Sequence, residues 1–213
     1  MSENQDRKIA PLKQLHEKRE YAKTELLDDF PVVALSSADG VYIATIAKAA
    51  NHDKIDLLAN ARGVNIVFAG RGNQADLSIL KTALERLVNE YINHVSVFDL
   101  TGRLISQAAA EILRNHYLNK IKALSVQVIV ADPLTPGYPF WATNFEGETI
   151  VAKNLTISAA GIQEIKKDFK SMTEILSFAK EFLKNHNGIR QFYQLKFDSP
   201  ARQLADGRKK TTR

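Results

Sequence analysis

Apolar residues recur at helical spacing in five stretches of the chain and form short strand-like runs between them. A spacing of three to four residues predicts amphipathic helices, and continuous or alternating apolar runs of four to eight residues predict strands. The predicted helices cover residues 8–27, 77–91, 105–112, 162–172 and 175–183. The predicted strands cover residues 31–37, 41–47, 55–59, 65–69, 126–130, 139–145, 149–154, 155–161 and 191–197.

Turn and capping signals divide these elements. Asp39-Gly40 and Glu146-Gly147 each separate two strand-like runs, which predicts two β-hairpins. Residues 70–73 read Gly-Arg-Gly-Asn and predict a sharp reversal. Residues 171–174 form a capping box, which predicts the start of the last helix, and Gly188 predicts its C-cap.

The order of the elements favours an α+β fold. One helix precedes four strands, then two helices, four strands, two helices and a final strand. Strands and helices do not alternate strictly, so a doubly wound parallel sheet is disfavoured. Paired helices between runs of strands instead predict two packed antiparallel sheets with helices outside them, a four-layer αββα sandwich.

Size and composition suit one domain with a sizeable core. The chain has 213 residues, of which 45% are hydrophobic and 25% charged, and it has no cysteine. The absence of cysteine excludes disulfides and thiolate chemistry and fits a cytoplasmic protein. The start is polar, without a signal-peptide core, and no apolar run reaches membrane-spanning length, so no membrane partner is expected.

The net charge of +5 comes mainly from the end of the chain. Residues 202–213 carry five basic side chains against Asp206, a net +4, and residues 1–25 carry six basic against five acidic, a net +1. The rest of the chain is balanced. A nucleic-acid-binding protein usually carries its basic excess on its folded part, so a solvated tail is favoured and no nucleic-acid partner is expected.

Several other sequence features do not indicate a catalytic or ligand-binding site. The glycine-rich stretch at 70–73 lacks the Lys-Ser/Thr ending of a phosphate-binding loop. The histidines have no metal-ligand spacing, so no metal is expected; they are His16, His52, His94, His116 and His186. Trp141 lies in a predicted strand and is interpreted as a core residue.

The ordered set of segments resembles the proteasome-type branch of the N-terminal-nucleophile hydrolases over residues 15–198. The resemblance lies in "DGVYIATIAKAANHDKIDLLANARGVNIVFAGRGNQADLSIL", then "ALSVQVIVADP", then "PFWATNFEGETIVAKNLTISAAG". The leading "EKREYAKTELL" resembles the helix that α-type subunits add in front of the fold. The resemblance therefore implies a proteasome-like sandwich with an extra N-terminal helix, and the short polar front is similar to the bacterial 20S type.

The resemblance also implies that the chain lacks the family's active site. Catalytic subunits use an N-terminal threonine whose amine can act as base, but the matching strand begins "DFPVVAL", without Thr, Ser or Cys. Thr24 lies too far back, within the helix. The position of the family's catalytic aspartate falls near Ile46, which cannot orient a nucleophile. A non-catalytic α-type subunit without a cofactor is expected.

For an α-type subunit, the family implies a heptameric ring that stacks on β-type subunits and docks an AAA ATPase activator ring. Activator tails bind between subunits, where a lysine pairs with the tail carboxylate beside a glycine turn. By motif position these are Lys54 and Gly70-Arg71, and Glu25 is placed in the same pocket. The Tyr-Asp and Phe-Ser-Pro gate stretch of archaeal and eukaryotic relatives is missing, so their gate geometry is not expected.

The chain is therefore expected to divide into three parts. Residues 1–27 form a gate segment and α-type helix, 28–199 the sandwich domain, and 200–213 a flexible basic tail. Two other functions stay open from the residues alone. One is a divergent N-terminal-nucleophile amidohydrolase, and the other is a nucleic-acid-binding protein that uses the basic tail.

Overall fold

The computed structural model describes residues 3–49, 53–61, 64–135 and 137–196, which contain four α-helices and ten strands. The helices are α1 (Glu3–Leu27), α2 (Gln74–His94), α3 (Gly102–Asn119) and α4 (Met172–Leu183). The first strands are β1 (Val32–Ser37), β2 (Gly40–Ala47), β3 (Ile55–Ala61), β4 (Val64–Gly72) and β5 (Val126–Ala131). The others are β6 (Phe140–Thr143), β7 (Thr149–Ala152), β8 (Leu155–Ser158), β9 (Gly161–Glu164) and β10 (Ile189–Lys196).

The strands form two antiparallel sheets of five strands each. The first sheet has the order β10-β2-β1-β8-β9, and the second has the order β3-β4-β5-β6-β7. The β1–β2 hairpin closes where Ser37 pairs with Gly40, which confirms the predicted turn at Asp39-Gly40. β6 and β7 pair around Glu146-Gly147, which confirms the second predicted hairpin.

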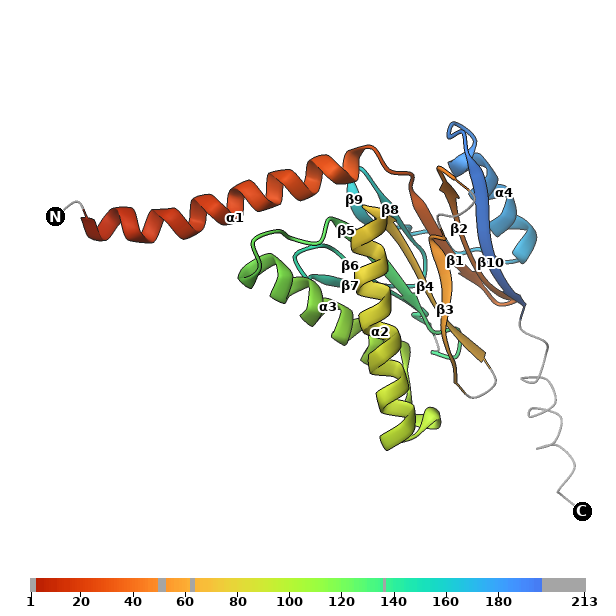
Figure 1. The fold of residues 1–213 in the computed structure, drawn as a ribbon. Helices are drawn as coiled ribbons and strands as arrows, with labels where there is room; N and C mark the ends of the chain where they lie inside the picture. The colour runs from red at the N-terminus through yellow and green to blue at the C-terminus, as the bar shows by residue number, and fades with distance from the viewer. Residues whose placement is uncertain (1–2, 50–52, 62–63, 136, 197–213) are drawn as a thin grey trace, which may run out of the picture.

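Three hydrophobic clusters fix how these elements pack. One cluster lies between the two sheets, a second joins the second sheet to α2 and α3, and a third joins the first sheet to α4. β1 contributes to two clusters because its side chains alternate: Val32 and Ala34 face the other sheet, while Val33 and Leu35 face α4. In Figure 1, α2 and α3 accordingly lie on one side of the sheets and α4 on the other.

The helix predicted over residues 162–172 is wrong. Residues 161–164 form β9, which pairs with β8, and α4 begins only at Met172. Gly161 has a φ of 96°, so the chain reverses there in a conformation that suits glycine. The predicted cap at Ser171 is confirmed, because its side chain accepts from the Glu174 N–H. Gly188 is not the C-cap, which is Lys184.

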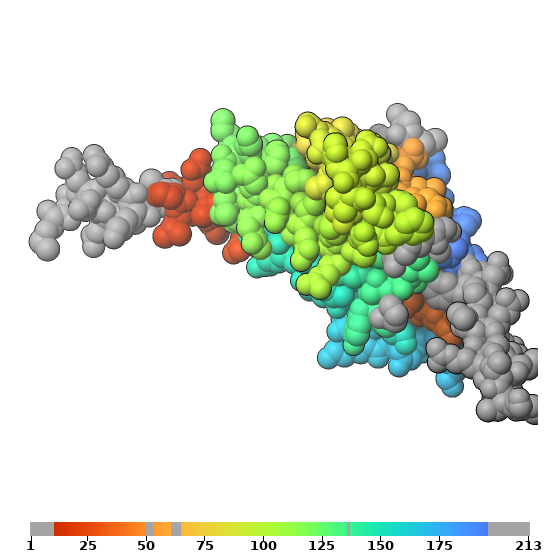
Figure 2. Space-filling model, turned by 90° about the horizontal axis from the view of Figure 1, so that it is seen from below, coloured from red at the N-terminus to blue at the C-terminus, as the bar shows by residue number. Residues whose placement is uncertain are grey.

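Helix α1 extends beyond the packed layers. Its C-terminal part is anchored by Ala22 and Leu26, which pack with Phe145, whereas Leu12 is 67% exposed. Figure 1 shows the helix running past the end of α3, and Figure 2 shows its described residues protruding beside the surface formed by α2 and α3. Hydrogen bonds to Tyr117 and Glu146 extend back along α1 to Leu15, whereas residues 11–14 are exposed.

The packing between the sheets makes a specific prediction for stability. Ile129 is fully buried between the sheets, so Ile129→Ala removes apolar contacts and leaves a cavity. We expect a loss of about 2–5 kcal/mol in the free energy of unfolding, measured by urea denaturation. The control Ile121→Ala removes a side chain that is 93% exposed and should change this free energy by less than about 0.5 kcal/mol. Equal effects of both variants would contradict the assigned core.

Candidate functional site

A cavity of about 320 Å3 lies where α1 ends, between the turn into β1 and the ends of β3 and β4. Two of the predicted site residues, Lys54 and Glu25, line it. Its lining comes from segments far apart in the sequence: Thr24, Glu25, Asp28, Asp29, Lys48, Lys54, Gly72, Asn73 and Gln74. The fold therefore brings the C-terminal end of α1 against the start of β3.

Lys54 lines this cavity and is buried, with only 3% of its surface exposed. Its ammonium forms an ion pair with the carboxylate of Asp29 and lies 5.8 Å from the centre of the Phe30 ring. Its main-chain N–H donates to Oε1 of Gln191 on β10, at 2.9 Å. Burial lowers the pKa of Lys54, and the neighbouring Asp29 carboxylate opposes this shift.

Asp29 connects this lysine to strand β4. Its second carboxylate oxygen accepts the main-chain N–H of Gly72 at 2.5 Å. Its main-chain carbonyl accepts from the guanidinium of Arg71 at 2.9 Å. The residue thus uses both its side chain and its main chain to hold the turn between α1 and β1.

Arg71 lies behind the cavity and is fully buried. Its guanidinium donates to the carbonyl of Leu26 at the end of α1, as well as to Asp29 and, at 3.5 Å, to Gln127 on β5. Burial lowers the pKa of Arg71, and the Asp29 carboxylate opposes that shift. Arg71 therefore anchors α1, and it is not among the residues that line the cavity.

The predicted glycine turn at Gly70-Arg71 is wrong, because both residues lie within strand β4 and pair with β5. The N–H of Gly70 is used in a hydrogen bond to the carbonyl of Lys54, at 2.9 Å. A Cβ on Gly70 would come within 2.5 Å of the Leu77 side chain, so glycine here permits close packing of α2. The main-chain donor that faces the cavity is Gly72, which the sequence prediction missed together with Asp29.

Glu25 also lines this cavity. Its carboxylate accepts from the side-chain amide of Asn73 at 3.3 Å, which links α1 to the start of α2. Asn73 also caps α2, because its side-chain oxygen accepts the N–H groups of Ala75 and Asp76. Glu25 therefore holds the edge of the cavity together.

The start of β1 is occupied by aliphatic and backbone groups. Val32 is fully buried, and the carbonyl of Pro31 accepts from the Thr45 hydroxyl at 2.8 Å. Ile46, at the position expected for the family's catalytic aspartate, is also fully buried and packs in the cluster with α4. Phe30, Pro31 and Val32 carry no hydroxyl, thiol or amine side chain at this point of the chain.

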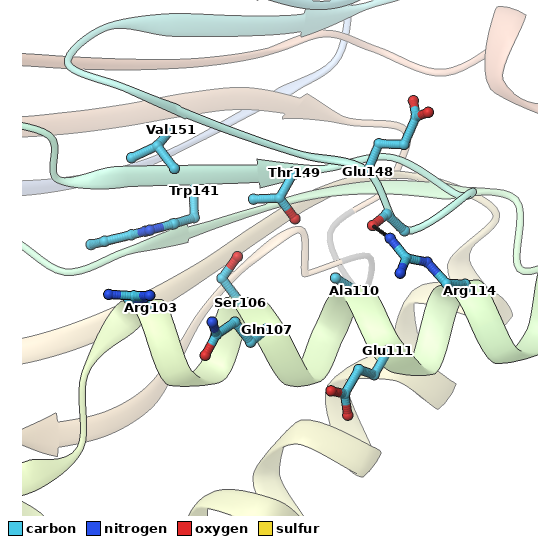
Figure 3. Close-up of a pocket in the computed structure, with 11 residues that line it drawn as sticks. Arg103, Ser106, Gln107, Ala110, Glu111, Arg114, Trp141, Glu148, Thr149 and Val151 are labelled. Atoms are coloured by element: carbon cyan, nitrogen blue, oxygen red, sulfur yellow. Dashed lines mark hydrogen bonds between the residues drawn. The ribbon is translucent and has the colours of Figure 1, made fainter.

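A larger cavity of about 540 Å3 lies between α3 and the strands β6 and β7 (Figure 3). Arg114 crosses one end of it and donates to the carbonyl of Gly147 at 3.2 Å. The Ser106 hydroxyl is buried there and, within the described residues, has no hydrogen-bond partner.

The described residues contain no group of three or more His, Cys, Asp or Glu side chains that could hold a metal ion, and His52 lies outside them. Within the same ranges, none of the helices combines the length and hydropathy needed to cross a membrane.

Comparison with known proteins gives one informative similarity. The chain is 26% identical over 140 residues to a protein of Frankia alni named proteasome subunit alpha. The match covers 65% of this chain and 56% of the relative, so the chain spans just over half the length of that protein. No family model matches the chain. The similarity supports a proteasome α-like family, and the two antiparallel sheets with their helices fit a proteasome-like fold.

The buried ion pair predicts strong coupling between its two members. Lys54→Met and Asp29→Asn should each lower the free energy of unfolding by about 3–5 kcal/mol, because each leaves one buried charge without its partner. The double variant should lose less than the sum of the single losses, by about 0.5–3 kcal/mol. Urea denaturation of the four proteins measures this cycle.

A more exposed pair in the same molecule is the control. Lys81 and Asp56 lie 2.6 Å apart, with side chains 31% and 26% exposed. Lys81→Met should therefore cost about 1 kcal/mol or less. Additive losses in the Lys54–Asp29 cycle, or a loss from Lys81→Met as large as that from Lys54→Met, would contradict the assigned role of the buried pair.

Proposed function

We propose that this chain is a non-catalytic α-type subunit of a bacterial 20S proteasome core particle. The observation that carries the proposal is the position of α1, which is joined through residues 28–31 to the start of β1. In a catalytic subunit, the matching strand begins with the free N-terminal nucleophile. In this chain, helix α1 precedes that strand, β1. The name of the Frankia relative supports the same assignment.

The arrangement of layers supports the finer fold proposal. Helices α2 and α3, the second sheet, the first sheet and α4 follow one another through three hydrophobic clusters. We assign this order to the four-layer αββα sandwich of the N-terminal-nucleophile hydrolases, and α1 to the extra helix of α-type subunits. The proposed divisions are residues 1–27, 28–199 and 200–213, of which the last lies outside the described residues.

The exposure of α1 supports a role in assembly. Leu12 is 67% exposed, on a helix that extends past the packed layers. An apolar side chain on a projecting helix gains free energy when a neighbouring subunit covers it. In the proposed heptameric ring, α1 contacts the next copy, and the ring stacks on β-type subunits in the cytoplasm.

The proposed gate is formed by the polar front of the chain, residues 1–7. Residues 1 and 2 lie outside the described part, and from Glu3 the backbone is helical. In the proposed particle these ends surround the axial pore and control the access of substrates to the β-type ring.

The cavity at the end of α1 supports docking of an AAA ATPase ring. Lys54 supplies a cation and Gly72 a main-chain donor on one wall, and Glu25 lines the edge. A terminal carboxylate of an activator tail is recognised by this combination of charge and N–H groups. We therefore propose Lys54 and Gly72 as the carboxylate-binding groups, with Glu25 and Arg71 holding the surrounding elements in place.

Assembly and activity test the proposal together. The full chain co-expressed with a β-type partner should give a stacked ring complex by native mass spectrometry, and the chain alone should not cleave fluorogenic peptides. A chain that stays monomeric with every β-type partner tested, or that turns over peptides by itself, would refute the proposed function. The second result would favour a divergent amidohydrolase.

The projecting helix gives a matched pair of variants. Leu12→Lys should weaken ring formation, shifting the concentration at which rings dissociate upward by about tenfold, because a charge replaces an apolar contact. Lys13→Ala changes an exposed neighbour on the same turn and should leave that concentration within about twofold. Mass photometry across a dilution series measures both. An unchanged dissociation concentration for Leu12→Lys would remove α1 from the interface.

A further inference from the structure

Asp29 already fills the position that an external carboxylate would take beside Lys54. One of its oxygens pairs with the Lys54 ammonium, and the other accepts the Gly72 N–H at 2.5 Å. A buried cation and a main-chain donor are together the groups that recognise a terminal carboxylate. The chain therefore provides this site with a carboxylate of its own.

Burial prevents the lysine from holding two carboxylates at once. Lys54 is 3% exposed and the Asp29 side chain 7% exposed, yet both line the cavity that opens at the end of α1. Of the neighbouring cations, Lys48 is exposed on the cavity wall and Arg71 is bound to main-chain carbonyls. A second carboxylate placed against Lys54 would therefore share one buried ammonium with Asp29, which is unfavourable. An incoming carboxylate can approach the pair through the cavity, but it must replace Asp29 to bind Lys54.

The other carboxylates around the cavity hold different positions. Glu25 is bound to the Asn73 amide, and Asp28 is exposed at the surface. Among the three acidic residues that line the cavity, Asp29 is the one paired with Lys54. Competition for the lysine is therefore assigned to a single side chain.

Asp29 also holds the junction between α1 and β1, so replacing it has a structural consequence. Its carbonyl and the carbonyl of Leu26 both accept from the Arg71 guanidinium. If the Asp29 carboxylate leaves Lys54 and Gly72, Asp29 keeps its main-chain contact with Arg71 and loses its side-chain contacts with the strands. The last turn of α1 then loses the ionic part of its attachment to β3 and β4.

We propose that an external carboxylate binds this site by exchanging with Asp29, and that the exchange loosens the junction between α1 and β1. The inference rests on the proposed function, because it supplies the regulation of the docking site. Asp29 acts as a built-in competitor that lowers the affinity for the incoming tail. Binding of the tail is thereby coupled to the position of the helix that carries the N-terminal end of the chain.

The test uses the assembled full-length chain and a chemically defined probe. The probe is a pool of fluorescent heptapeptides with free C-terminal carboxylates, and the same pool with amidated C-termini is the control. Fluorescence anisotropy compares the unmodified protein with Asp29→Asn, with the charge-matched neighbour Asp28→Asn, and with the double variant Asp29→Asn/Lys54→Met. The double variant removes both buried charges, so it lacks the cation and leaves no unpaired charge in the site.

Asp29→Asn should bind the free-carboxylate pool about tenfold more tightly than the unmodified protein, since the competitor is gone. Asp28→Asn should match the unmodified protein within about twofold, and neither the amidated pool nor the double variant should show binding. Equal or weaker binding by Asp29→Asn, or no binding by any protein, would overturn the inference. Ring assembly with the β-type partner is measured separately by native mass spectrometry. A negative result for the exchange with Asp29 therefore leaves the test of the proposed function unaffected.

A measurement on the unmodified protein covers the case in which Asp29→Asn does not fold. Hydrogen exchange of the backbone amides over residues 26–31 should become faster when the free-carboxylate pool binds, and should not change with the amidated pool. Binding of the pool without faster exchange in this segment would also overturn the inference.

Discussion

The buried ion pair between Lys54 and Asp29 is the constraint on which the arrangement of α1 depends. Two charges removed from water are tolerated only when they are paired and their remaining hydrogen-bonding groups are satisfied. Here the Gly72 N–H satisfies the second carboxylate oxygen of Asp29, and the Arg71 guanidinium binds the main-chain carbonyl of the same residue, so the end of α1 is fixed against β4. The apolar contact of α1 is small by comparison, with Ala22 and Leu26 as its buried members. The helix is therefore positioned mainly by polar contacts.

This placement gives the polar groups near the start of β1 a structural role. The charged groups nearest the start of β1 are committed to holding the chain that precedes it, because Lys54 pairs with Asp29 and Arg71 binds main-chain carbonyls. The aliphatic side chain of Ile46 packs toward α4 in the same region. The polar groups of this corner attach the end of α1 to β3 and β4.

Most helices and strands could be predicted from the sequence, because the spacing of their apolar residues is regular over the whole element. The runs at 126–130 and 77–91 gave a buried strand and an amphipathic helix that the structure confirms. The failure at 162–172 has a physical cause: Ile162 and Ile165 have helical spacing by coincidence, while pairing with β8 makes the segment extended. The family resemblance selected Lys54 and Glu25 as candidate site residues, and both line one cavity. Asp29 could not be found in this way, since its contact with a lysine 25 positions away depends on the tertiary fold.

A helix attached through charges differs from one attached through a large apolar face in how a ligand can move it. Apolar burial scales with area and is lost only when the surfaces separate. A buried ion pair can instead be exchanged one partner at a time, provided that the replacement brings the same charge. The cavity of about 320 Å3 beside Lys54 gives such a replacement a route to the pair. The position of α1 is thus open to control by a carboxylate, because its attachment to the strands is itself made by one.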